Sequence, residues 1–171
     1  MPGGTGEVGR ALATDRRVNL IEEGFDLAVV FMGAHEDSSM VARKIVSAAN
    51  DHGIATEDVV IDPLAMTVGA DTEAVTTTLA TISLIRDELG VNMCLGASNV
   101  SFGLPQRHVL NAGFLPMAMA AGLTSAIMST AEVCVQSVRA SDLLLGHDAW
   151  GTSWIAAHRA REAAAKEAAT A

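Results

Sequence analysis

The chain has 171 residues, which is enough for one domain with a substantial core. Half of the residues are apolar and only 18% are charged, so the composition excludes an intrinsically disordered chain. The formal net charge of −9 argues against non-specific nucleic-acid binding, because that binding depends on Lys and Arg neutralising phosphates.

Residues 1–25 show no apolar periodicity, and we expect them to be poorly defined. Four units of a short apolar strand followed by an amphipathic helix are predicted after them. The strands are expected at 26–32, 57–64, 91–97 and 125–128, and the helices at 38–53, 71–90, 106–123 and 131–146. Pro116 should kink or divide the third helix. We place the domain at residues 26–154, and the Ala-rich segment 155–171 is expected to be a further helix or a tail.

The two cysteines and one long uncharged segment indicate the cellular compartment. Cys94 and Cys134 form no motif, which indicates buried free thiols in a reducing environment rather than a disulfide or a metal site. The uncharged stretch 109–131 is long enough to span a membrane, but Pro116 and the turn-like "AGLTS" predict a helix, a break and a short strand. No apolar segment typical of a signal peptide begins the chain. We therefore expect a cytoplasmic protein that does not contact a membrane.

Apolar strands that alternate with helices predict a parallel sheet covered on both faces, with right-handed crossovers. Two α/β architectures fit this pattern: an open doubly wound sheet and a TIM (β/α)8 barrel. Four units are about half of a barrel of ~250 residues. In both architectures, ligands bind at the carboxyl ends of the strands.

Asp62 stands at the end of the second expected strand, between Ile61 and Pro63. A buried carboxylate needs a hydrogen-bonding partner. It could bond backbone amides of the following turn, since Asp-Pro often opens a turn. It could also accept two hydrogen bonds from a ring that carries adjacent N–H and amino donors.

The third expected strand runs into "GASNVSFGLPQR" (96–107), an unusually polar segment. Asn99 offers both a donor and an acceptor, but an Asn after a strand is also a common turn residue. Gly96 would allow a ligand to approach the backbone. Arg107 opens the next helix, where the helix dipole disfavours a cation, so we expect an anionic group to hold it.

Two further patterns are weak. His35, Glu36 and Asp37 are consecutive, so their side chains diverge and a metal site is not indicated. The glycines of "GGTGEVG" (3–9) follow no strand and precede no Gly-Lys-Ser/Thr, so a phosphate loop is not indicated either.

The segments "VIDPLAMTVGAD" and "LGASNVSFGLPQRHVLNAGFLPMAMAAGLTSAIM" resemble the pterin-binding methyltransferases, namely the methyltetrahydrofolate:corrinoid methyltransferases and the folate domain of cobalamin-dependent methionine synthase. The resemblance runs from about Asp26 to Trp154 and covers the second half of that family's barrel. It implies a TIM barrel, usually a homodimer. It also implies transfer of the N5 methyl group of methyltetrahydrofolate to the cobalt of a corrinoid that a partner protein carries.

The resemblance also implies residue roles. Asp62 matches the aspartate that bonds the pterin ring, and Asn99 matches the asparagine that bonds near N5. The remaining matched positions around the pocket are Gly96, Ser98, Ser101 and Arg107. Residues 1–25 do not resemble the first half of the barrel, which implies either a truncated enzyme or completion by another chain.

Two alternatives stay open. One is a non-catalytic, degenerate pterin-binding module that lacks half of its site. The other is dihydropteroate synthase, which would require a lysine and a Ser-x-Arg near the late strands. The late strands show neither in that arrangement.

Overall fold

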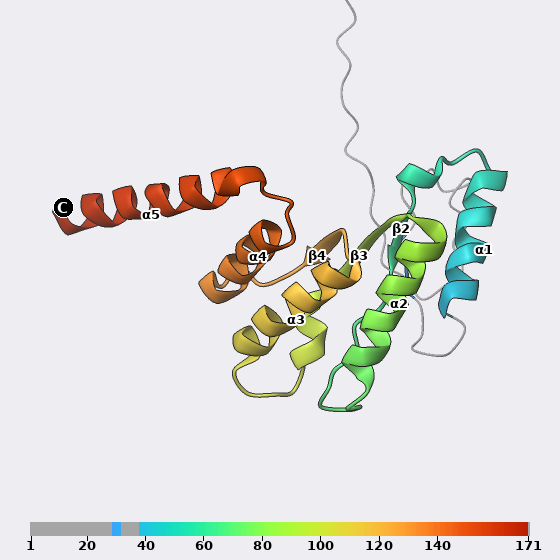
Figure 1. Ribbon diagram of the computed structural model, residues 1–171. Helices are drawn as coiled ribbons and strands as arrows, with labels where there is room; N and C mark the ends of the chain where they lie inside the picture. The colour runs from blue at the N-terminus through green and yellow to red at the C-terminus, as the bar shows by residue number, and fades with distance from the viewer. Residues whose placement is uncertain (1–28, 32–37, 171) are drawn as a thin grey trace, which may run out of the picture.

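The computed structural model describes residues 29–31 and 38–170, and all statements below refer to them (Figure 1). The strands are β1 (Val29–Phe31), β2 (Val60–Asp62), β3 (Asn92–Gly96) and β4 (Ser125–Ile127). The α-helices are α1 (Ser38–Asp51), α2 (Ala74–Leu89), α3 (Arg107–Ala121), α4 (Glu132–Leu144) and α5 (Thr152–Thr170). Short 3-10 turns are η1 (Thr56–Asp58), η2 (Ala97–Ser101) and η3 (Ala149–Gly151). The predicted alternation of strands and helices is confirmed.

The four strands are parallel and lie in the order β1-β2-β3-β4. Right-handed crossovers in a sheet that always grows in one direction put every connecting helix on the same face. A doubly wound sheet reverses its growth and so has helices on both faces. The described sheet is therefore singly wound, like the wall of a TIM barrel, and the doubly wound alternative is wrong for this part of the chain.

Side-chain alternation along the strands agrees with one covered face. Ile61, Met93 and Leu95 are fully buried, and they belong to the same core as Ile82 of α2 and Leu115 of α3. On the opposite face, among the described residues, Asn92 and Ser125 are exposed and Ile127 is 74% exposed. The expectation that helices cover both faces is thus not met here, because single winding leaves the second face without helices.

Helix α1 buries a narrow stripe. Ala42 and Val46 provide its buried contacts, whereas Met40 and Val41 are 48% and 39% exposed. Among the described α-helices its main contact is with α2, so a narrow buried stripe is sufficient.

Helix α3 runs through Pro116 as one continuous helix, so the predicted division at Pro116 does not occur. Pro116 has no N–H to donate to the carbonyl of Ala112 four residues earlier. The hydroxyl of Ser137 on α4 donates to that carbonyl instead, at 2.5 Å. The neighbouring helix therefore supplies the hydrogen bond that the proline removes.

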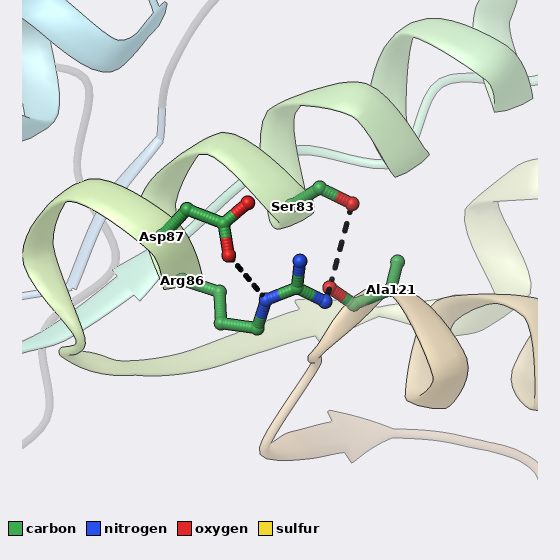
Figure 2. A network of polar contacts seen from close by, with 4 residues as sticks. All are labelled: Ser83, Arg86, Asp87 and Ala121. Carbon is green, nitrogen blue, oxygen red and sulfur yellow. Dashed lines mark hydrogen bonds and ion pairs between the residues drawn. The ribbon is translucent and has the colours of Figure 1, made fainter.

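The carboxyl end of α3 is capped from α2 (Figure 2). Arg86 donates from Nη1 to the carbonyl of Ala121 at 2.7 Å and from Nε to Asp87 at 2.7 Å. A cation at this end satisfies an otherwise unpaired carbonyl and favours the helix dipole. Gly122 follows with a φ of 115°, and a Cβ there would lie 2.5 Å from Cδ of Arg86. Only glycine fits this position.

Residues 109–131 form most of α3, a break and β4, as the sequence predicted. None of the helices in the described ranges is long and apolar enough to cross a membrane. Helix α5 extends away from the sheet, and its main described contacts are with α4 and η3 (Figure 1).

Candidate functional site

The loops that follow β2 and β3 form one platform at the carboxyl edge of the sheet. β2 ends at Asp62, and β3 ends at Gly96 and continues directly into η2. Thr67 donates from Oγ1 to the carbonyl of Phe102 at 2.8 Å, and the amide of Val68 donates to the carbonyl of Val100 at 3.0 Å. The two predicted site loops are therefore bonded to each other.

Asp62 is 6% exposed. Its Oδ1 accepts a hydrogen bond from the amide of Leu64 at 2.8 Å, so the sequence expectation of a turn-closing aspartate is confirmed. Within the described ranges no other donor reaches this carboxylate. Burial raises the pKa of Asp62, and the hydrogen bond from Leu64 opposes that shift. The carboxylate is therefore under-solvated and retains acceptor capacity.

The turn after Asp62 is strained. Leu64 has a φ of 57°, which side chains other than glycine rarely adopt. Thr78 of α2 donates to the carbonyl of Leu64 at 3.1 Å and holds the turn in place. Gln106 has a φ of 50° in the other loop. Such conformations concentrate at functional sites because the surrounding structure must hold them.

Asn99 lies in η2 and is exposed. Its carboxamide lies over Gly96, where a Cβ would come within 3.2 Å of Nδ2. Among the described residues, no hydrogen bond reaches the Asn99 side chain. The loop therefore presents an amide that packs against its glycine neighbour and whose donors and acceptor have no partner among the described residues.

Ser98, Ser101 and Arg107 build the loop rather than face open solvent together. Arg107 donates from Nη2 to the carbonyl of Ser98 at 2.8 Å and from Nε to the hydroxyl of Ser101 at 3.1 Å. Ser101 is fully buried and donates to the same Ser98 carbonyl at 3.3 Å. Among the described residues, loop oxygens rather than an anionic side chain bond Arg107, so the anionic group expected from the sequence stays a prediction.

The sequence reasoning missed Asn111, on the second turn of α3. This residue is 2% exposed, and its Nδ2 donates to the hydroxyl of Ser98 at 3.2 Å. Its Oδ1 is buried without a hydrogen-bond partner in the described structure. An asparagine inside the apolar run "VLNAGFL" was the available signal, because a buried amide needs partners.

A pocket of about 610 Å³ lies elsewhere, between α3, β4 and α4. Its lining includes Leu115, Met119, Asp142 and His147 but none of the predicted site residues. The predicted site residues lie instead on the loops that follow β2 and β3, which are bonded to each other. The described ranges contain no group of three or more His, Cys, Asp or Glu side chains that could hold a metal, and residues 35–37 and 3–9 lie outside those ranges.

Parallel strands that carry a buried carboxylate and a free amide at their carboxyl ends define the class of α/β proteins that bind a small molecule at that edge. The family described as "Pterin binding enzyme" matches residues 33–129, more than half of the chain. The chain belongs to this family, as the resemblance of its two segments indicated.

The chain is also similar to a curated protein, the methylcorrinoid:tetrahydrofolate methyltransferase of Eubacterium limosum. The two are 31% identical over 110 residues, which is 63% of this chain and 41% of that protein. The matched region thus spans about two fifths of the length of the relative.

Proposed function

We propose that this chain, as a whole or truncated enzyme, transfers the methyl group between N5 of methyltetrahydrofolate and the cobalt of a corrinoid protein. The observation that carries the proposal is the joined platform, which holds the buried carboxylate of Asp62 and the free amide of Asn99 on neighbouring strand ends. The name of the relative also contains both substrates.

Asp62 suits the pterin ring for a physical reason. A buried carboxylate with one backbone donor is costly to leave charged, and burial already raises its pKa. A pterin offers a ring N–H and an exocyclic amino group side by side, and these can donate to two carboxylate oxygens. The bound ring would then supply hydrogen-bond donors that the Asp62 carboxylate lacks among the described residues.

Asn99 suits the chemistry at N5. The methyl group leaves without the electron pair of the C–N bond, and this pair stays on N5. Nitrogen is a poor leaving group unless it carries a proton. A neutral carboxamide can hydrogen-bond the protonated amine without taking its proton, and a positioned hydrogen bond of this kind lowers a barrier by about 2–4 kcal/mol. The corrinoid cobalt supplies the nucleophile as the second substrate, so no Cys or Ser nucleophile is required.

The direction of transfer belongs to the proposal. The notation of the relative's name puts the methyl group on the corrinoid at the start, whereas the resemblance of the sequence implies methyltetrahydrofolate as the donor. One site serves both directions, because the forward and reverse reactions pass through the same transition state. An assay should therefore begin from each methylated substrate in turn.

The proposed partners are a corrinoid protein and a second copy of the chain. Light scattering during size-exclusion chromatography measures whether two copies of the chain associate. A homodimer is expected, and a monomer at all concentrations would contradict this part of the proposal.

The experiment that tests the function is calorimetric titration of methyltetrahydrofolate into the full chain, followed by methyl transfer to reduced cobalamin. We expect saturable binding and transfer, and both should weaken in Asp62→Asn. Binding without transfer would favour the alternative of a non-catalytic pterin-binding module. No binding at millimolar ligand would contradict any pterin function of this chain alone.

A further inference from the structure

Ser98 of η2 takes part in three hydrogen bonds with side chains, and it is adjacent to Asn99. Its carbonyl accepts from Arg107 at 2.8 Å and from the Ser101 hydroxyl at 3.3 Å. Its own hydroxyl oxygen accepts from Nδ2 of Asn111 at 3.2 Å. Three side chains, two of them from α3, therefore hold the backbone carbonyl and the side-chain hydroxyl of Ser98.

The bond from Asn111 also determines what the Ser98 hydroxyl can do. A hydroxyl has one proton and two lone pairs. The amide N–H of Asn111 occupies a lone pair, and no described acceptor takes the proton. Ser98 is only partly buried, so this proton remains available at the surface of the loop.

Asn111 itself is in an unfavourable place. It is 2% exposed in a helix whose other buried positions are apolar, and its Oδ1 has no partner among the described residues. A buried acceptor without a partner destabilises a fold by about 1–3 kcal/mol. Stability alone therefore does not explain an asparagine at this position.

We propose that Asn111 is a positioning residue that turns the Ser98 hydroxyl proton toward an acceptor atom of the pterin ring. This inference rests on the proposed function. Asp62 accepts hydrogen bonds from the ring, and the Ser98 hydroxyl, oriented by Asn111, donates a hydrogen bond to the ring. The two loops thus recognise opposite hydrogen-bonding character in one ligand.

The test compares Asn111→Leu and Ser98→Ala, singly and together, in the full chain. Leucine has a similar size, forms helices well and removes the unpartnered oxygen, so the melting temperature should stay level or rise. Calorimetric affinity for methyltetrahydrofolate should fall about tenfold in either single variant, as expected for one lost hydrogen bond. The double variant should also lose about tenfold rather than a hundredfold, because both changes remove the same bond.

Ser141→Ala is the matched control. Ser141 is a buried polar residue on α4 that donates to the Ser137 carbonyl, and in the described structure it makes no hydrogen bond to η2. This variant should keep full affinity. A lower melting temperature of Asn111→Leu with unchanged affinity would assign Asn111 a structural role and overturn the inference. Additive losses in the double variant would also overturn it. Failure of the wild-type chain to bind would instead overturn the proposed function, and the inference with it.

Discussion

The carboxamide of Asn99 lies over Gly96, so close that a Cβ on residue 96 would come within 3.2 Å of Nδ2. Two residues that the sequence singled out separately thus form one unit. The glycine leaves the space that the amide occupies, and the amide has no other partner among the described residues. The position of the Asn99 amide, the proposed catalytic group, therefore depends on residue 96 having no Cβ.

Gly96→Ala should displace the Asn99 amide by a few tenths of an ångström or turn it to another rotamer. Asn99 is exposed and can move, so the free energy of unfolding should change by less than about 1 kcal/mol. Methyl transfer should fall about tenfold or more, because catalysis depends strongly on the position of the reacting groups. Single-turnover rates and chemical denaturation measure the two effects.

Gly113→Ala is the control for that change. Gly113 lies in α3, where an added Cβ meets nothing within 4 Å. Alanine there should stabilise the helix by about 0.5–1 kcal/mol and leave methyl transfer unchanged. Equal transfer rates in Gly96→Ala and Gly113→Ala would contradict the proposed role of the Gly96–Asn99 contact.

Asp62→Asn should stabilise the chain in a pH-dependent way. Burial raises the pKa of folded Asp62 above its ordinary value of 3.8, so its charged form destabilises the folded state. This penalty is absent below pH 3.8 and develops as the pH rises through the folded-state pKa. The asparagine oxygen can still accept from Leu64. The gain in stability should therefore be largest at neutral pH and shrink as the pH falls.

Urea denaturation of wild type and Asp62→Asn across this pH range measures the gain. A gain that does not vary with pH would show that the charge of Asp62 is not its source. The same variant should bind methyltetrahydrofolate about tenfold more weakly or worse, because it loses a charged acceptor.

Ser137→Ala should destabilise the chain by about 1–2 kcal/mol, because it leaves the Ala112 carbonyl without the donor that replaces the missing N–H of Pro116. In the background Pro116→Ala, residue 116 regains an N–H and can bond that carbonyl itself. Ser137→Ala should then have a smaller effect. A double-mutant cycle by thermal denaturation measures the difference, and simple additivity would argue against the compensation.

Gly122→Ala should destabilise more than Gly90→Ala. Both glycines have positive φ, at 115° and 61°, so both variants incur backbone strain of about 1–3 kcal/mol. Of these two glycines, only Gly122 would place a Cβ against Arg86, at 2.5 Å from its Cδ. Arg86→Ala should relieve part of the Gly122→Ala defect. Equal unfolding free energies for the two glycine variants would contradict the steric argument.

The sequence predicted the alternation of strands and helices well, because short apolar runs and glycine stops are local signals. Gly90 and Gly122 are the C-caps of α2 and α3, close to the predicted helix ends. It could not choose between single and double winding, since strand order depends on contacts distant in the chain. The sequence also predicted that Pro116 would kink or divide α3. It could not show that Ser137, which lies on another helix, donates to the carbonyl that Pro116 leaves without an N–H.

For the site, the sequence found residues but not their relationships. Asp62 and Asn99 were identified from their positions after predicted strands and from family resemblance. The bonding of Arg107 to the Ser98 carbonyl, the close approach of Asn99 to Gly96 and the role of Asn111 depend on how η2 folds against α3. No periodic pattern encodes such contacts.

The central claim is that Asn99 acts on the methyl-transfer step rather than on ligand affinity. The most direct measurement is the single-turnover rate of methyl transfer by Asn99→Ala, together with its calorimetric affinity for methyltetrahydrofolate. We expect the rate to fall about a hundredfold while the affinity changes by less than about threefold, because a bond that strengthens in the transition state is removed. Equal losses of rate and affinity, or an unchanged rate, would contradict the account.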